Sequence, residues 1–160
     1  MSTVALLCLL TPSAMPLVAQ ATAPFSENIS HYVLAAACIL AFFALWSRRR
    51  AYQPIRQSLW ISYLLWISIA EEVAFRLLLP AVLEIELSRL HAHIISNAMF
   101  ALIHYFTLRW RAVNCCVTFL GGMGLSHLMG QGDLVLVILV HWVGTFMNTP
   151  WPPNTRRHKC

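Results

Sequence analysis

Residues 57–83 read QSLWISYLLWISIAEEVAFRLLLPAVL, an apolar run that is interrupted in its middle by Glu71, Glu72 and Arg76. At 1.5 Å per residue, a helix of this length can cross a hydrocarbon core of about 30 Å. An ionisable side chain near the centre of a bilayer costs about 2.5 to 3.5 kcal/mol even on a lenient insertion scale, so three such residues close together indicate a functional site. The stretch therefore predicts a transmembrane helix that also carries the chemistry of the protein.

The composition of the whole chain is that of a membrane protein. Of its 160 residues, 59% are hydrophobic and 11% are charged, whereas about 25% are charged in an ordinary soluble domain. The formal net charge of +5 comes from Lys and Arg at the ends of apolar segments, which indicates topology and attraction to the lipid bilayer. Basic and aromatic residues are not interleaved, so nucleic acid is not an expected partner.

Four further apolar segments flank the central one. By number they are residues 31–46, 94–108, 112–129 and 134–148. Together with the central helix they predict an all-α, polytopic transmembrane bundle of five spans. Pro80 is expected to end or kink the central helix. Residues 84–93 are expected to form an outer loop, part of which extends the next helix.

The N-terminal segment allows two interpretations. Residues 4–19 are apolar but short, and they are broken by Pro12 and Pro16. They form either a weak signal peptide or a poor additional span, which would raise the number of spans to six. The expected organisation is an N-terminal segment, a helical bundle and a basic cytoplasmic tail, at residues 1–30, 31–149 and 150–160.

Basic side chains mark one side of the predicted bundle. They cluster at residues 48–50, 109–111 and 156–159. When the spans alternate in direction, all three clusters fall on the same side, which the positive-inside rule identifies as the cytoplasm. The sequence thus predicts an integral membrane protein with a cytoplasmic C-terminus.

Helical geometry separates the three charges of the central helix. Glu72 and Arg76 are i, i+4 neighbours and can pair on one face, whereas Glu71 points about 100° around the helix. Glu72 is therefore predicted to be the paired carboxylate and Glu71 the free one. A free carboxylate in a pocket of low dielectric constant can act as a general base toward water, provided that other groups hold the water.

Two later spans supply such groups. In the segment FALIH, His104 lies one turn beyond Phe100. The last span carries His141, with Thr145 four residues later and Asn148 seven residues later. Seven residues are close to two full turns, so Asn148 shares a face with His141.

These side chains could activate water to hydrolyse a peptide bond within the membrane. Glu71 would take a proton from a water molecule that His104 helps to orient. His141 would stabilise the oxyanion together with Asn148 or Thr145. Glu71, His104 and His141 could instead bind one divalent metal such as zinc, with water in the open position. The residues allow both forms of the site, without a cofactor or with one metal ion.

The three motifs together resemble those of the CPBP family of intramembrane proteases. The resemblance covers about residues 57–149 and is carried by EExxxR at 71–76, FxxxH at 100–104 and the late-helix His141. The family includes the type II CAAX prenyl endopeptidases and bacteriocin-processing or self-immunity proteins. The resemblance implies proteolysis of a membrane-associated substrate near its C-terminus, with Glu71 and His104 activating water. It leaves metal dependence open, because this is disputed within the family.

Two positions depart from the family pattern. The last motif usually has Asn or Asp four residues after its His, where this chain has Thr145. We favour Asn148 for this role because an amide matches the family's chemistry. Leu77 stands where a Gly commonly follows the family's Arg. The chain is most similar to compact bacterial members, some of which are thought to process C-terminal sorting tags. This implies the bacterial inner membrane and a membrane-anchored or C-terminally tagged substrate.

Two other functions are compatible with the sequence. A non-catalytic membrane partner of the bacteriocin-immunity type would bind without cutting, so substitution of Glu71 would leave its protection intact. A proton or ion transporter would also use buried charges, but we would expect paired acids on more than one helix and broken half-helices. In this chain the acids of the predicted spans lie within one segment, which disfavours a transporter.

Overall fold

The computed structural model describes residues 14–48 and 54–153, and these ranges contain helices and no strand. This confirms the predicted all-α class. The elements are α2 (Ala14–Glu27), α3 (Ile29–Arg48), α4 (Pro54–Glu72), the π-helical turn η1 (Val73–Leu78), α5 (Leu79–Leu83), α6 (Arg89–Leu108), α7 (Ala112–Met129) and α8 (Leu134–Asn148).

Several sequence predictions fall on residues outside the described ranges. These are the first half of the N-terminal apolar segment, Arg49 and Arg50, and the tail beyond residue 153. Residues from 14 onward form α2, in which the buried Ala21 packs with Val73 of η1 and Leu134 of α8. Signal peptide and additional span both stay predictions for this segment.

Two helices, α3 and α7, are long and apolar enough to cross a membrane by length and composition. The third apolar helix, α8, is shorter, at 15 residues. On α7, Val113, Val117 and Leu120 form an i, i+4, i+7 stripe that is 64–71% exposed. An apolar stripe of this kind on the outside of a bundle suits contact with lipid. The total of five or six spans stays a prediction.

The segment that carries both acids is one continuous helical rod. α4 passes into η1 and then into α5 without an intervening loop. Pro80 lies inside α5 and the helix continues to Leu83, so Pro80 does not end it. The π turn just before it shifts the hydrogen-bond register, and a residue without an N–H group is tolerated there.

The loop after this rod is shorter than predicted. α6 already begins at Arg89, so the expected loop of residues 84–93 ends at Ser88, whose extended backbone precedes the first helical turn. His91 and His93 are consequently helical residues.

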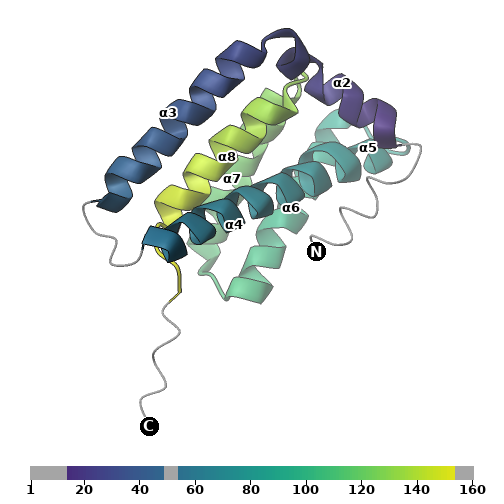
Figure 1. The fold of residues 1–160 in the computed structure, drawn as a ribbon. Coiled ribbons are helices and arrows are strands. Elements are labelled where there is room, and N and C mark those ends of the chain that lie inside the picture. The colour runs from purple at the N-terminus through teal and green to yellow at the C-terminus, as the bar shows by residue number, and fades with distance from the viewer. Residues whose placement is uncertain (1–13, 49–53, 154–160) are drawn as a thin grey trace.

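Aromatic rings from α3 and α8 form the main core. The ring centroids of Phe43 and Phe146 lie 4.1 Å apart, and Trp142 meets Phe43 edge-on at 4.9 Å. Leu64 of α4 completes this buried cluster. The cluster places α8 between α3 and α4 (Figure 1).

Hydrogen bonds between side chains and backbone fix α4 against α8. Nε1 of Trp142 donates to the carbonyl oxygen of Ile61 at 3.0 Å, and Nε1 of Trp60 donates to the carbonyl oxygen of Thr149 at 2.9 Å. α6 is tied to the π turn by the hydroxyl of Ser96, which donates to the carbonyl oxygen of Phe75. The three helices that carry the predicted motifs therefore have a defined register.

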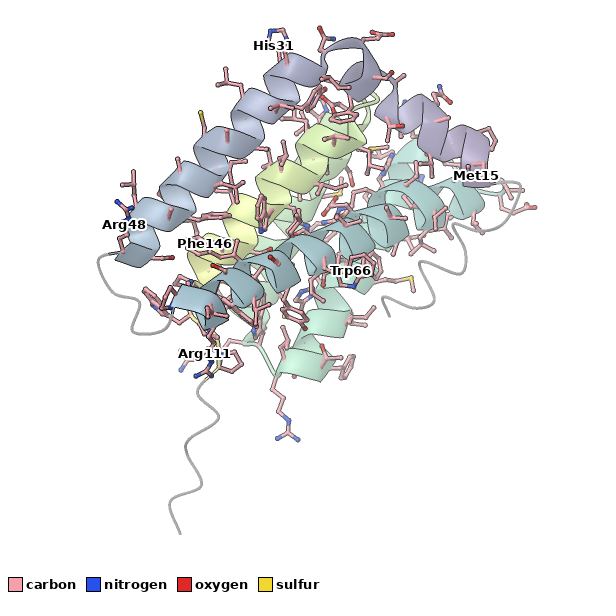
Figure 2. All side chains as sticks on the ribbon, viewed as in Figure 1. Met15, His31, Arg48, Trp66, Arg111 and Phe146 are labelled. Atoms are coloured by element: carbon pink, nitrogen blue, oxygen red, sulfur yellow. The ribbon has the colours of Figure 1, made fainter. Side chains whose placement is uncertain are left out.

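Arg48 and Arg111 lie away from the end of the bundle that carries His31 (Figure 2). Arg89, in contrast, begins α6 at the end opposite to Arg109, and Arg76 is buried. The cytoplasmic side of the bundle stays a prediction.

We expect Phe146→Ala to destabilise the bundle by about 3 to 5 kcal/mol, because it empties a site that is fully buried between two aromatic rings. The neighbouring Met147→Ala is the matched control, since Met147 is 51% exposed. The midpoint of thermal unfolding in detergent measures both variants. Equal midpoints for the two would contradict the placement of the core.

Candidate active site

Three helices bring the predicted catalytic side chains together. Oε1 of Glu71, on α4, lies 4.0 Å from Nε2 of His104, on α6. Oε2 of Glu71 lies 3.5 Å from Nε2 of His141, on α8. The Glu71 side chain is 23% exposed and each histidine side chain 13%. The carboxylate thus faces both imidazoles in a largely buried cluster that retains some access.

Glu72 is the paired carboxylate, as its helical spacing predicts. Nε of Arg76 lies 3.4 Å from Oε2 of Glu72, and neither side chain has exposed surface. The other oxygen of Glu72 accepts a hydrogen bond from Nδ1 of His141, a contact that spacing within one helix could not predict. The two oxygens of Glu72 therefore face Arg76 and His141. The two oxygens of Glu71 face the Nε2 atoms of His104 and His141.

Both imidazoles are anchored through Nδ1. The carbonyl oxygen of Phe100 lies 2.8 Å from Nδ1 of His104. In the same way, Oε1 of Glu72 is the partner of Nδ1 of His141. A carbonyl or carboxylate oxygen only accepts hydrogen bonds, so each Nδ1 carries a hydrogen and donates it. In each ring Nε2 is then the nitrogen available to Glu71 and to a bound group.

The ring of Phe100 packs against three charged or titratable side chains of the cluster. Its ring centroid lies 4.5 Å from that of His104 and 6.0 Å from that of His141. The guanidinium carbon of Arg76 lies 4.1 Å from the same centroid, a cation–π distance. Phe100 of the FxxxH motif thus fixes ring orientation by contact, in addition to supplying its carbonyl oxygen.

The two candidates for the oxyanion role lie further along α8. Thr145 is half-buried, and Asn148 is exposed at the end of the helix. The rise of α8 places the Asn148 backbone about 10 Å from His141 along the axis, compared with about 6 Å for Thr145. The choice between them stays a prediction, as do the catalytic roles of Glu71, His104 and His141.

Behind Arg76 the structure adds two residues that the sequence analysis did not assign to the site. Asn97 of α6 is fully buried, and its amide nitrogen donates to the carbonyl oxygen of His93 and to Oγ of Ser126, at 2.8 Å each. Gly122 of α7 lies against Asn97 and Arg76. One amide in an apolar helix and a glycine among several are ordinary features of membrane bundles. Neither residue therefore indicates a functional site in the sequence.

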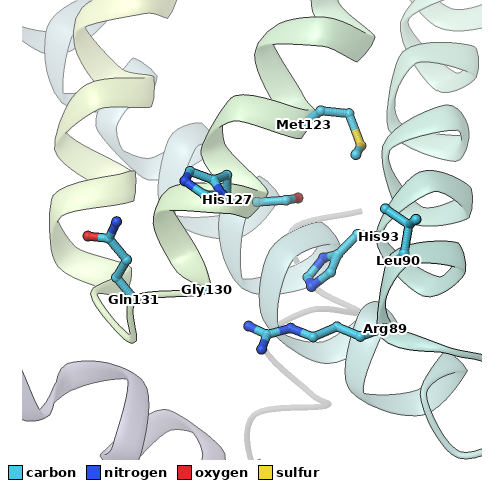
Figure 3. Close-up of a pocket in the computed structure, with 8 residues that line it drawn as sticks. Arg89, Leu90, His93, Met123, His127, Gly130 and Gln131 are labelled. Atoms are coloured by element: carbon cyan, nitrogen blue, oxygen red, sulfur yellow. The ribbon is translucent and has the colours of Figure 1, made fainter.

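A pocket of about 520 Å³ lies away from this cluster, where the start of α6 meets the end of α7 (Figure 3). His93 and Arg89 of α6 extend toward it, and Nε2 of His93 lies 3.7 Å from Oε1 of Glu84. The lining residues are Arg89, Leu90, His93, Met123, Ser126, His127, Gly130 and Gln131. The lining includes none of Glu71, His104 and His141, so this pocket is separate from the carboxylate cluster.

Within the described ranges, no group of three His, Cys, Asp or Glu side chains is arranged to hold a metal ion. Glu71, His104 and His141 are nevertheless the donor types that zinc accepts. The anchors on their Nδ1 atoms are of the kind that metal-bound histidines have. The forms of the site with and without a metal both stay predictions.

Comparison with known families identifies the chain. Residues 53–147 match the family described as type II CAAX prenyl endopeptidase Rce1-like. The chain belongs to this Rce1-like family. The match covers more than half of the chain and includes all three motifs, which confirms the resemblance seen in the sequence. No curated protein and no solved structure matches the chain. Membership in the Rce1-like family makes this a membrane protein of an endopeptidase family.

We expect Glu72→Gln to destabilise this Rce1-like protein by about 3 to 5 kcal/mol, because it leaves the buried Arg76 without a counter-ion. Glu71→Gln changes the adjacent acid in the same way and is expected to cost much less. Thermal unfolding in detergent compares the two variants. A Glu71→Gln variant that is as unstable as Glu72→Gln would contradict the division between paired and free acids.

Proposed function

We propose that this chain is an intramembrane endopeptidase that hydrolyses a peptide bond near the C-terminus of a membrane-associated protein. The observation that carries the proposal is the position of Glu71, whose two oxygens face Nε2 of His104 and Nε2 of His141. A non-catalytic binding partner needs no such convergence of a carboxylate and two anchored imidazoles, so the geometry favours an enzyme.

The space between Glu71 and His104 suits a water molecule. Their facing atoms are 4.0 Å apart, too far for a direct hydrogen bond but close enough for one water to reach both at about 2.8 Å. Because Nδ1 of His104 carries a hydrogen, Nε2 of the neutral ring is an acceptor. The water then donates one hydrogen to each partner and directs a lone pair toward the scissile carbonyl carbon.

The reaction needs one proton acceptor and one group that stabilises negative charge. Glu71 takes the water proton as the new C–O bond forms, and it later returns that proton to the leaving amine as the C–N bond breaks. His141 faces the other oxygen of Glu71, and when Nε2 also carries a hydrogen, so that both ring nitrogens donate, it stabilises the oxyanion through Nε2–H, assisted by Asn148 or Thr145. Glu72 orients His141 for this role.

If the activity requires a metal, Glu71, His104 and His141 are the residues that would hold it. A divalent ion such as zinc would polarise the scissile carbonyl and lower the pKa of a bound water. Phe100 and Glu72 would then orient the two imidazoles through their Nδ1 atoms. Activity that survives exhaustive chelation would assign the reaction to Glu71 and the histidines alone.

We further propose that the substrates are exported proteins with C-terminal sorting tags, cut in the bacterial inner membrane. The similarity of the motifs to compact bacterial members supports this finer proposal. A non-catalytic immunity protein is the alternative, and it predicts that substitution of Glu71 leaves the biological effect intact.

Glu71→Gln is expected to reduce cleavage at least about 100-fold, because an amide cannot accept the water proton and general-base catalysis contributes 10²- to 10⁴-fold. Mass spectrometry of membrane proteins from cells with the wild-type or the Glu71→Gln protein should reveal one C-terminus that differs. Glu86→Gln, in the exposed turn after α5, is the matched control. Undiminished cleavage by folded Glu71→Gln would refute the mechanism.

The oxyanion assignment can be tested on the same substrate. If Asn148 donates to the oxyanion, Asn148→Ala should lower kcat about 100-fold with little change in KM, because the bond forms only in the transition state. Thr145→Val, which removes only the hydroxyl, should then retain nearly full kcat. The reverse pattern would transfer the role to Thr145.

A further inference from the structure

Arg76 lies behind the candidate active site and is only partly paired. Its Nε lies 3.4 Å from Oε2 of Glu72, which makes an ion pair but no hydrogen bond, and Nη1 and Nη2 also have no hydrogen-bond partner among the described residues. The side chain has no exposed surface. Burying a charged group with open donors is costly unless a neighbouring group accepts from it. An acceptor beside the guanidinium would reduce this cost.

Asn97 has the complementary deficit. Its amide nitrogen lies 2.8 Å from the carbonyl oxygen of His93, and because a carbonyl only accepts, this contact fixes which end of the amide is the nitrogen. Oδ1 then points the other way, and nothing in the described ranges donates to it. Asn97 is fully buried, so leaving its acceptor unpaired also costs free energy.

Gly122 shows that these two groups converge. A Cβ at this position would overlap Oδ1 of Asn97 and would lie 2.9 Å from Nη2 of Arg76. Both atoms therefore occupy the space that a side chain at residue 122 would fill. At Gly121 and Gly124 of the same helix, an added Cβ would have no described atom within 4 Å. The requirement for glycine is thus specific to Gly122.

We propose that Asn97 is a positioning residue: its Oδ1 accepts a hydrogen bond from Nη2 of Arg76 across the gap at Gly122. The amide thereby directs the Nε edge of Arg76 toward Glu72. A hydrogen bond between a charged donor and a buried amide oxygen is among the stronger kinds in proteins. The proposed hydrogen bond gives a partner to Nη2 of Arg76 and to Oδ1 of Asn97.

The proposed hydrogen bond of Asn97 affects Glu71 through a chain of contacts. Arg76 holds Glu72, Glu72 holds Nδ1 of His141, and His141 presents Nε2 to Glu71 at 3.5 Å. Loss of the Asn97 anchor frees the guanidinium to turn and withdraws a partner from Glu72. The effect on His141 geometry rests on the proposed hydrogen bond and on these contacts, whereas its effect on catalysis rests in addition on the proposed function.

The test compares Gly122→Ala with Gly121→Ala and Gly124→Ala. All three add one methyl group and replace glycine inside the same helix, where alanine is the better helix former. Only Gly122→Ala places that methyl group between Asn97 and Arg76. We expect it alone to shift the ring nitrogen resonances of His141, measured by NMR on histidine-labelled protein in detergent and assigned with His141→Gln.

His31, at the opposite end of the bundle (Figure 2), serves as the internal reference and should not shift. Asn97→Ala covers the case in which Gly122→Ala does not fold, because it removes the amide oxygen without adding volume or another acceptor. It should produce the same shift at His141. His141 resonances at their wild-type positions in a folded Gly122→Ala or Asn97→Ala protein would overturn the proposal.

Kinetics on the substrate found with Glu71→Gln give the second readout. Gly122→Ala is expected to lower kcat about tenfold to hundredfold with KM unchanged, which is the effect of losing one charge-assisted hydrogen bond behind the site. A raised KM with unchanged kcat would assign these residues to substrate binding and overturn the positioning role. Because the NMR experiment needs no substrate, failure of the proposed proteolysis is distinguishable from failure of this inference.

Discussion

Glu72 and Arg76 form an ion pair without exposed surface inside a bundle whose exterior is apolar. Two charges in such surroundings persist only if each is compensated, because removing one partner leaves the other buried and unpaired. The rest of the site is arranged around this requirement. Glu72 uses its second oxygen on His141, Arg76 covers the ring of Phe100, and α7 carries a glycine where the guanidinium approaches.

This arrangement leaves the carboxylate of Glu71 outside the ion pair. Glu71 is displaced around the helix from the ion pair and faces the Nε2 atoms of the two histidines. One acid thus neutralises a charge and orients an imidazole, while the adjacent acid directs its two oxygens toward His104 and His141. Adjacent carboxylates in one motif acquire different tasks because a helix turns about 100° between them.

The pocket between α6 and α7 is separate from the carboxylate cluster. The pocket beside Arg89 and His93 is lined from the ends of α6 and α7, whereas the carboxylate cluster lies beside His141, in the middle of α8. Between them, Asn97, Phe100 and Arg76 are buried side chains that fill the interior. These residues shape the site from behind without lining the pocket.

The sequence by itself determined the helical class, the helix positions of α3, α7 and α8, and the pairing of Glu72 with Arg76, because apolar periodicity and i, i+4 spacing are properties of a local segment. It also identified His104 and His141 through motifs that match a known family. Only the tertiary structure decided that both histidines face Glu71 and that Glu72 bonds His141, since these contacts join α4, α6 and α8. The same holds for the π turn at Val73–Leu78 and for the approach of Asn97 to Arg76 over Gly122. Such features arise from the packing of helices, and no spacing within one segment encodes them.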